Sequence, residues 1–314
     1  MHYRNMLEII ELMNFENIQL TNRSNSFSRV FKCLMNKVFD GCFVERLRRK
    51  IYSRTIKNHG LTDNWTYEEW QSLLREGNKL LKVVVYTCIT GNYDVPKKPL
   101  YYPENVDYIL FTTEFENDVK VQGWDAKPIP EHIKEYGTDV IINRYVKFHP
   151  HELFMDKYDI AIYVDGNITV VSDLVVLVEL MNKDIGLAIH KHYCRSCIYE
   201  EVKACIALKK GNKNNLNKQV ALYRLQGFPQ NYGLLECNVL ITDLKSEKAK
   251  SIYGQWWNEF LRSGSGRDQI ALPFVLWRNG IKVSEVATLG RNVYRNPKIR
   301  VSSHNVTNDR TCLL

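Results

Sequence analysis

An acidic residue follows an apolar run at the point where a buried strand would end. The segment YDIAIYVDGNITV places Asp165 directly after the run Tyr158 to Val164, and Asn167 comes two residues later. A carboxylate in this position can hold a divalent cation that bridges the phosphates of a nucleotide, which is how Mg²⁺ and Mn²⁺ are commonly bound. The same Asp-x-Asn pattern also closes strands as an Asx turn, so the residues alone leave both interpretations open.

The first strand-like run ends in a loop without a standard nucleotide motif. Lys82 to Cys88 is rich in β-branched residues, and the turn Gly91-Asn92-Tyr93-Asp94 follows it. This loop has neither the G-x-G-x-x-G pattern of dinucleotide-binding domains nor the G-x-x-x-x-G-K-[ST] phosphate loop. The sequence therefore argues against a Rossmann dehydrogenase and against a P-loop enzyme.

Strands and helices alternate through the region that holds these residues. Further strands are predicted at Asp107 to Thr113, Ile185 to Ile189 and Asn238 to Thr242, and helices at Asn143 to Phe154, 198–225 and 246–262. Short apolar strands that alternate with helices imply an α/β fold with a mostly parallel sheet covered on both faces. Ligands bind at the carboxyl ends of the strands in such sheets, which is where Asp165 lies.

The composition is that of a globular protein with an uneven charge. The 314 residues include 43 Lys and Arg against 35 Asp and Glu, a net charge of +8, and 45% are hydrophobic, which excludes low-complexity disorder. Residues 1–60 hold eleven basic and five acidic side chains and so carry +6 of this charge, and their apolar positions recur at helical spacing. Such a helix either packs on the main domain, which we favour, or lies on an anionic membrane. Because no zinc-finger or RNP-like pattern accompanies it, we expect no nucleic-acid partner.

The lack of an apparent targeting signal and the pattern of cysteines both bear on the cellular compartment. Three Glu residues interrupt the apolar positions of the first 20 residues, and no apolar run approaches the roughly 20 residues that span a bilayer. We therefore expect a cytoplasmic protein, at most peripheral at the inner face of the membrane. A chain of this length needs no disulfides to hold its core, so the eight cysteines are expected to be free thiols, and Cys194-x-x-Cys197 lacks the further ligands of a zinc site.

Several segments resemble a known family. The order strand, T-x-x-x-G-x-Y-D loop, strand, basic helix and Y-D-x-x-x-Y-x-D resembles a GT-A-fold nucleotide-sugar glycosyltransferase. The segments HKHYCRSCIYEEVKACIALKKG, QVALYRLQGFPQ and QWWNEFLRSGSGRDQIALPFVLWR are similar to the glycosyltransferase-like family of plant mucilage-related proteins and many bacteria, formerly catalogued as a domain of unknown function. The resemblance implies a GT-A-like domain over residues 81–314, with a mostly parallel twisted sheet flanked by helices. A basic helical N-terminal extension would occupy residues 1–80.

The resemblance also implies a nucleotide pocket and a metal site. The expected nucleotide contacts are Thr87, Gly91, Tyr93, Asp94, Arg144, Lys147, Asp165 and Tyr199. Arg144 and Lys147 would meet the diphosphate, because their i, i+3 spacing puts both on one face of the predicted helix. Asp165, Asn167 and His304 would hold Mn²⁺ or Mg²⁺. Since Asn167 stands where an Asp-x-Asp enzyme has its second Asp, the need for a metal stays open.

Three further residues are implied in catalysis. His192 and Arg195 belong to a segment that matches the family pattern H-x-x-R-S-x-x-Y-[DE]-E, and Arg195 offers a cation to a phosphate. Asp268, which opens a predicted helix after a Ser/Gly-rich stretch, would be the general base that deprotonates the acceptor hydroxyl. The alternative is that Asp268 caps this helix.

The resemblance predicts transfer of a sugar to a hydroxyl of a glycan or a lipid-linked acceptor. The donor would be a nucleoside diphosphate sugar, with a UDP-sugar as the first candidate. Two alternatives stay open. One is a catalytically silent GT-A-like binding module at the membrane surface, which the basic extension would hold there. The other is a lipid-amide hydrolase, although the sequence has neither a G-x-S-x-G elbow nor an H-E-x-x-H zinc motif.

Overall fold

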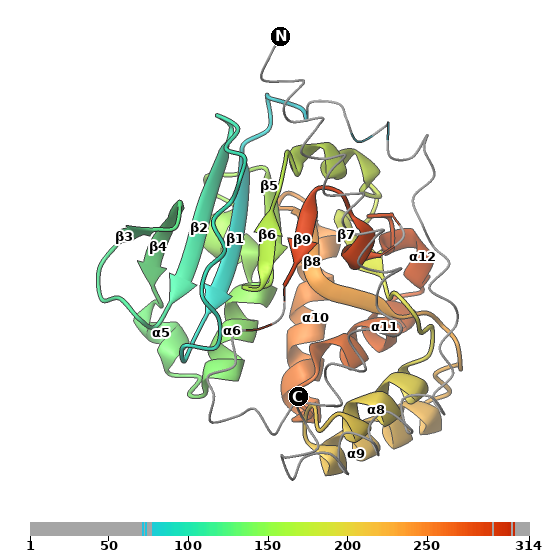
Figure 1. Cartoon of the computed structure of the whole chain (residues 1–314). Coiled ribbons are helices and arrows are strands. Elements are labelled where there is room, and N and C mark those ends of the chain that lie inside the picture. Colours follow the sequence, from blue (N-terminus) through green and yellow to red (C-terminus); the bar gives the residue numbers. More distant parts are fainter. Residues whose placement is uncertain (1–70, 72, 74–76, 291, 303, 305–314) are drawn as a thin grey trace, which may run out of the picture.

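A seven-stranded sheet forms the centre of the computed structural model, which describes residues 71, 73, 77–290, 292–302 and 304 (Figure 1). The strands are β1 Val83–Ile89, β2 Val106–Thr112, β3 Val119–Val121, β4 Trp124–Pro128, β5 Ile160–Val164, β6 Ile168–Val170, β7 Leu187–Lys191, β8 Leu235–Asp243 and β9 Ile299–Val301. The order in the sheet is β3-β4-β2-β1-β5-β8-β7, and β6 pairs separately with β9. Strands β4, β2, β1 and β5 are parallel neighbours, while β8 is antiparallel to both β5 and β7. Only β3 and β8 of this sheet therefore run against the common direction.

Helices connect the strands, and several begin at well-formed caps. The helices are α5 Glu131–Lys134, α6 Asp139–Phe148, α7 Pro150–Phe154, α8 Ile198–Ala207, α9 Lys213–Leu225, α10 Glu247–Ser263, α11 Asp268–Arg278 and α12 Val283–Val286, with 3-10 helices η1 Val175–Leu180 and η2 Val293–Arg295. The Ser246 side chain accepts a hydrogen bond from Ala249 N at 3.1 Å, which starts α10. Gly264 ends α10 in the left-handed region at φ 55°.

The sheet is buried on both faces by different kinds of structure. Against one face pack α6, α7, α10 and α11, with Tyr86, Phe148 and Trp256 in the same apolar cluster. Against the other lie η1 and the small β6–β9 sheet, whose Val175 and Ile168 belong to a second cluster. Figure 1 shows these two layers on opposite sides of β1 and β5. A third cluster joins α8, α9 and α11.

The predicted α/β fold with a mostly parallel sheet is confirmed, with differences in detail. The expected helix from Asn143 to Phe154 is two helices, because Pro150 cannot continue α6 and instead occupies the first turn of α7. Strands β3, β4, β6 and β9 were not predicted, since runs of three to five residues carry little pattern. Residues 1–70 lie outside the described part of the chain, so the basic helical extension stays a prediction.

The expectation of free thiols is confirmed where the structure describes it. Cys88, Cys194, Cys197, Cys205 and Cys237 are all buried and unpaired. Both Cys194 and Cys197 precede α8, where Cys197 occupies the N-cap position and packs in the cluster of α8, α9 and α11. The C-x-x-C spacing therefore serves the core.

Candidate active site

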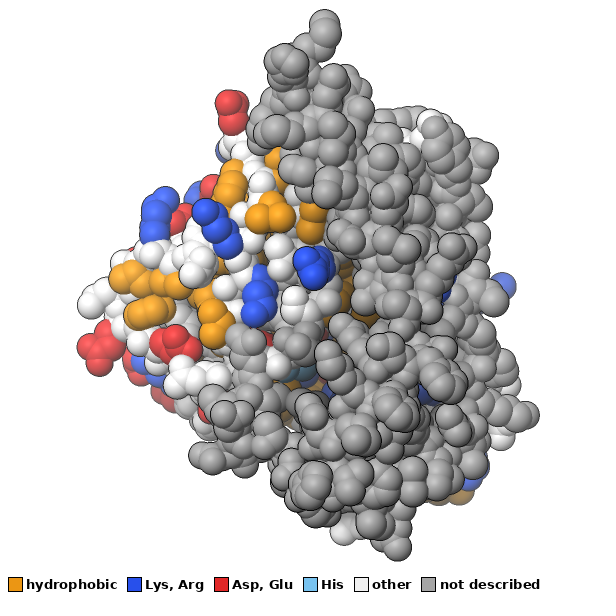
Figure 2. Space-filling view, in the orientation of Figure 1, with side chains coloured by type: hydrophobic (Ala, Val, Ile, Leu, Met, Phe, Trp, Pro, Cys, Tyr) orange, Lys and Arg blue, Asp and Glu red, His pale blue; other side chains and the backbone are white. Residues whose placement is uncertain are grey.

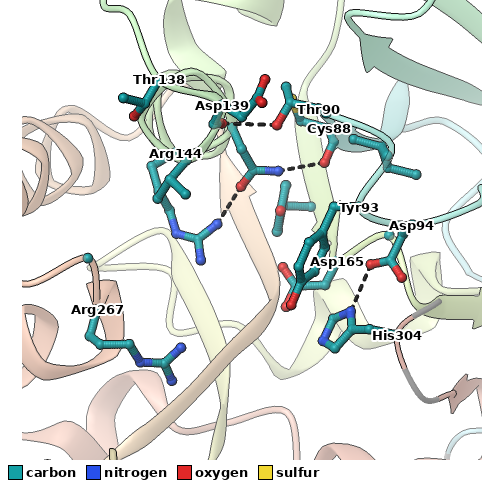
Figure 3. A pocket seen from close by; sticks show the side chains of 17 residues that line it. Cys88, Thr90, Tyr93, Asp94, Thr138, Asp139, Arg144, Asp165, Arg267 and His304 are labelled. Carbon is teal, nitrogen blue, oxygen red and sulfur yellow. Dashed lines mark hydrogen bonds and ion pairs between the residues drawn. The ribbon is translucent and has the colours of Figure 1, made fainter. Parts of the chain in front are cut away.

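A cavity of about 530 Å³ opens at the carboxyl ends of β1 and β5 (Figure 3). Its walls come from the loop after β1, the first half of α6, the residues after β5 and those just before α11. Of the residues predicted from the sequence, it is lined by Gly91, Tyr93, Asp94, Arg144, Asp165 and His304. This edge of the sheet is where α/β topology places ligands.

The loop after β1 is fixed to the first turns of α6. Thr90 Oγ1 donates to the Asp139 carbonyl at 2.9 Å, and Asn143 Nδ2 donates to the Cys88 carbonyl at 2.6 Å. Gly91 has a φ of 60°, and a Cβ at this position would lie 2.4 Å from Asp139 Oδ2. The left-handed backbone conformation favours glycine here, and an added Cβ would have to displace the Asp139 carboxylate.

Arg144 and Lys147 extend from one face of α6 toward the same carboxylate. Lys147 Nζ lies 2.7 Å and Arg144 Nε 3.3 Å from Asp268 Oδ2. The Lys147 side chain is only 2% exposed and lies 3.9 Å from Asp165 Oδ1, whereas Arg144 lines the cavity. Lys147 is thus a buried counter-charge, and Arg144 is the member of this pair that a ligand can reach.

The surroundings of Asp268 do not suit the base role predicted for it. Burial alone would raise the pKa of this carboxyl, but the opposite charges of Arg144, Lys147 and Arg267 outweigh burial and hold the pKa well below its ordinary value. A carboxylate with so little affinity for a proton is a poor general base near neutral pH. The capping alternative does not hold either, since Arg267 occupies the N-cap position of α11 and Asp268 is the first helical residue. The geometry fits a counter-charge that holds the basic side chains in place.

Arg267 brings a further cation to the cavity from the start of α11. Figure 3 shows it across the cavity from Thr90 and Tyr93, with the guanidinium directed into the open space. Its Nη2 donates to Gln269 Oε1 at 3.3 Å, while the buried Nε has no hydrogen-bond partner among the described residues. A buried donor without a partner is costly, and an anionic ligand would satisfy it.

Asp165, Asp94 and His304 lie on one side of the cavity (Figure 3). His304 Nδ1 is 2.8 Å from Asp94 Oδ2. Asn167 Nδ2 donates to the Ser302 carbonyl at 2.7 Å, and Ser302 N donates back to the Asn167 carbonyl at 2.9 Å. These two bonds fix the chain two residues before His304, so Asn167 positions the histidine at the cavity.

The oxygen and nitrogen donors at this corner are of the types that a divalent cation takes as ligands. The Asp165 side chain is 31% exposed, and because His304 Nδ1 faces Asp94, Nε2 is the ring nitrogen left for a metal. Within the described ranges, no three His, Cys, Asp or Glu side chains gather into a metal-binding group. Mg²⁺ usually takes one or two protein ligands and completes its shell with water and substrate phosphates. The donor set therefore fits a cation that binds together with a nucleotide. Asn167, expected as a ligand, bonds to Ser302 through Nδ2, and its role as a ligand, which would use Oδ1, stays a prediction.

His192 and Arg195 lie outside the cavity lining, in a buried polar cluster beside it. His192 Nε2 is 3.4 Å from Glu236 Oε1 and 3.5 Å from Glu201 Oε2, and Arg195 Nε is 2.5 Å from Glu201 Oε2. Burial lowers the pKa of His192 to about 4, so the imidazole is neutral near pH 7. Glu201 also acts on the pKa of Arg267, which places the cluster next to the cavity wall.

Two expected nucleotide contacts are also absent from the lining. Thr87 lies within β1 and is 1% exposed. Tyr199 packs in the cluster of α8, α9 and α11, where its hydroxyl donates to the Phe228 carbonyl at 2.8 Å and Arg224 covers its ring. The structure therefore gives both residues a role in packing.

Comparison with known families identifies the domain around this cavity. Residues 71–300 match the family described as TOD1/MUCI70, glycosyltransferase-like domain. The chain belongs to this family. The match confirms the resemblance seen in the sequence and includes every cavity residue named above except His304. No curated protein matches the chain.

Solved structures to which the chain is similar include two glycosyltransferases. The first is the apo form of WbbM, a bifunctional glycosyltransferase, with 13% identity and a TM-score of 0.39 over 62% of this chain and 37% of that one. The second is the galactosyltransferase LgtC in complex with donor and acceptor sugar analogs, with 12% identity and a TM-score of 0.37 over 62% of this chain and 70% of that one. The chain thus spans little more than a third of WbbM.

Sequence reasoning missed three residues that shape the site in this glycosyltransferase-like domain. Arg267 lies in the RDQ segment that carried the resemblance, and its place between a Ser/Gly-rich stretch and a helix was a usable signal. Asn143 and Asp139 gave none, because they act by contacting the loop after β1 across about 50 residues of sequence. Such contacts follow from tertiary structure alone.

Proposed function

We propose that the protein transfers a sugar from a nucleoside diphosphate sugar, with UDP as the first carrier to test, to a hydroxyl of a glycan or a lipid-linked acceptor. The observation that carries this proposal is the charge arrangement in the cavity. Arg144 and Arg267 approach one space from α6 and α11, at the carboxyl end of a strand that finishes at Asp165. Two guanidinium groups that converge from different elements suit a diphosphate, because each can donate paired N–H bonds to phosphate oxygens.

The loop after β1 would contact the nucleoside half of the ligand. The Tyr93 ring is 55% exposed at the cavity, with the His304 ring 5.0 Å away. An exposed aromatic face beside a diphosphate site can stack on a base. The contacts of Thr90 and Gly91 with α6 hold this loop before a ligand arrives, which lowers the entropic cost of binding.

The leaving diphosphate would be stabilised by the basic side chains. Arg144 and Arg267 contact it directly, while Lys147 adds positive potential from beneath, 3.9 Å from Asp165. Fixed charges of this kind act most strongly where water is excluded, and they need no reorganisation when the sugar–oxygen bond breaks. Asp268 keeps Arg144 and Lys147 in position through its two ion pairs.

A divalent cation fits this site as part of the bound nucleotide. Asp165 and His304 would hold Mn²⁺ or Mg²⁺, and Asn167 keeps His304 in place through Ser302. When bound, the cation supplies Lewis-acid stabilisation of the diphosphate charge.

We also propose peripheral membrane contact, which would bring a lipid-linked acceptor to the cavity. Among the described residues, no helix has the length and apolar character needed to cross a bilayer. In the stretch after the β1 loop, Val95, Leu100 and Tyr102 are each about half exposed. Figure 2 shows hydrophobic and basic side chains side by side on the face that carries β1 and β2. Sedimentation with anionic vesicles tests this contact. A comparison of the full chain with a chain that lacks residues 1–60 separates binding by this face from binding by the basic extension.

Calorimetry with UDP, GDP and their sugars tests the main proposal. We expect UDP or a UDP-sugar to bind, and we expect Arg144→Gln and Arg267→Gln each to weaken binding about tenfold or more, because each removes a charge-assisted hydrogen bond. Lys203→Gln is the matched control, since Lys203 pairs with Glu200 on the surface of α8. Absence of binding for every nucleotide would overturn the proposal. Binding without transfer to any acceptor would leave the silent binding module.

A further inference from the structure

A buried trio of side chains lies beside the cavity and has no part in the proposed binding of the nucleotide. Glu236 is the second residue of β8, His192 directly follows β7, and Glu201 is in α8. The strand pairing aligns His190 and Lys191 with Glu236 and Leu235, so the end of β7 reaches the start of β8. All three side chains are nearly buried, yet Glu236 keeps 12% of its side-chain surface exposed, the most of the trio.

Hydrogen bonds fix the tautomer of His192 and therefore the location of its proton. His192 Nδ1 accepts from Cys194 N at 3.2 Å and from Arg195 N at 3.0 Å. The neutral ring must then carry its proton on Nε2, which faces Glu236 Oε1 and Glu201 Oε2 at nearly equal distances of 3.4 and 3.5 Å. His192 is thus a donor to the two carboxyl groups.

The two carboxyl groups have different partners. Glu201 is ion-paired with Arg195 and also receives the Cys205 thiol at 3.4 Å. Glu236 instead receives a long bond of 3.4 Å from Gln269 Nε2, an amide that also donates to the Leu235 carbonyl at 2.7 Å. Glu201 therefore has a strong cationic partner in direct contact, and Glu236 is held by neutral donors.

The surroundings of Glu236 raise its affinity for a proton. Burial and the neighbouring charge of Glu201 raise the pKa of Glu236 to about 8, while Arg267, Arg195 and the Tyr193 N–H act in the opposite direction. The pKa of Asp268 is held far below its ordinary value. The titratable and charged groups that face Glu236 from the surrounding elements are His192, Tyr193, Cys194, Arg195, Glu201, Cys237, Arg267 and Tyr294.

Glu236 adjoins the end of the cavity at which Arg267 lies. Gln269, which bonds to Glu236, follows Arg267 by two residues on α11, and Arg267 lines the cavity. The Tyr294 side chain, on a residue that is 42% exposed, feels the charges of both Glu236 and Asp165. Asp94, Asp165 and His304 line the cavity on the side away from Arg267 (Figure 3), whereas Glu236 adjoins the side at which Arg267 lies.

We propose that Glu236 is the general base of the transfer and that His192 and Gln269 hold its carboxylate toward the acceptor. This rests on the proposed function. In the step, the acceptor O–H gives its proton to Glu236, and the acceptor oxygen forms a bond to the anomeric carbon. The bond from that carbon to the diphosphate oxygen breaks, and the diphosphate leaves with the electron pair.

The pH profile of the transfer tests the assignment. For the wild type we expect kcat to rise with pH and level off above about pH 8, because the base must be ionised. Glu236→Gln, which keeps the shape of the side chain, should lower kcat about 100-fold or more and remove this rise. UDP affinity by calorimetry should stay within about twofold, since general-base catalysis acts after binding. Glu200→Gln, one residue from Glu201 on the surface of α8, is the matched control.

The outcomes separate the two proposals. Transfer by Glu236→Gln at the wild-type rate and with the same pH profile overturns the base assignment alone, whereas a wild type that binds no nucleotide overturns the proposed function as well. A measurement on the wild type guards against a variant that fails to fold. Carbon NMR of labelled glutamate should show one carboxyl that titrates near pH 8, and His192→Phe should raise its pKa further, because the ionised carboxyl loses a hydrogen-bond donor. A spectrum in which every glutamate titrates below pH 6 rejects the assignment.

Discussion

Lys147 Nζ lies 2.7 Å from Asp268 Oδ2, and this contact joins α6 to α11 across 121 residues of sequence. Both side chains are at most 5% exposed, and Arg144 approaches the same oxygen at 3.3 Å. The pair lies buried outside the cavity lining and ties together the two elements that supply Arg144 and Arg267. An ion pair at this depth is expensive to break, because the remaining charge stays buried.

Replacing Asp268 with Asn should destabilise the fold by about 3 kcal/mol, because two cations lose their counter-charge. The pKa of Asp268 is held below that of an unfolded Asp, about 3.9, so the stabilisation is present above that pH and is lost as the pH falls below it. Urea unfolding at pH 7 measures the loss. Glu200→Gln breaks an ion pair of nearly equal length on the surface and should cost less than about 1 kcal/mol. Equal losses for the two variants would contradict the prediction.

Mild acid should weaken the fold through buried histidines. Burial lowers the pKa of His190 to about 3 and that of His192 to about 4, so both stay neutral in the folded protein while the unfolded chain takes up protons below about pH 6.5. Their pKa values are lower in the folded protein than in the unfolded chain. The stabilisation that comes from this difference is therefore present above pH 6.5 and is lost as the pH falls. At pH 5 each residue should cost about 2 kcal/mol. Urea midpoints at pH 7.5, 6 and 5 measure this loss as the difference between wild type and His192→Gln, because Glu236, with its pKa raised to about 8, gains stability over the same range. The exposed His132→Gln should leave the loss unchanged.

Gly91→Ala should weaken nucleotide binding by disturbing the loop after β1. The new Cβ would lie 2.4 Å from Asp139 Oδ2, and φ is 60°. Gly280→Ala is a matched control, because φ is 69° there and nothing lies within 4 Å of the added atom. Both variants should lose roughly 1–2 kcal/mol of stability from backbone strain. We expect a fall in UDP affinity for Gly91→Ala alone, and equal affinities would show that the loop tolerates the displacement of Asp139.

The fold was largely readable from local pattern, and the chemistry of the site was not. Buried runs such as β1 and β5 are continuous in sequence, so their apolar character predicts them directly. The role of Asp268 depends on Lys147 and Arg144, which reach it from another helix, and no spacing within the RDQ segment reveals that contact. Glu236 was overlooked for the same reason, since its proton affinity comes from burial beside Glu201. Residue types pointed to the carboxyl ends of β1 and β5, and tertiary contacts decide how strongly each carboxylate there and nearby holds a proton.

The metal prediction concerns Asp165, His304 and the bonds that hold the histidine. Because a cation at this corner would need phosphate oxygens to complete its shell, we expect weak Mn²⁺ binding to the free protein and about tenfold tighter UDP binding when Mn²⁺ replaces EDTA. His304→Ala should abolish this gain and leave UDP affinity in EDTA unchanged, while Asn167→Ala should reduce the gain because Ser302 loses its side-chain partner. His132→Ala, on the surface of α5, is the control. Calorimetry of UDP with each protein in both buffers decides the matter, and an equal gain in His304→Ala and wild type would assign the cation to other groups.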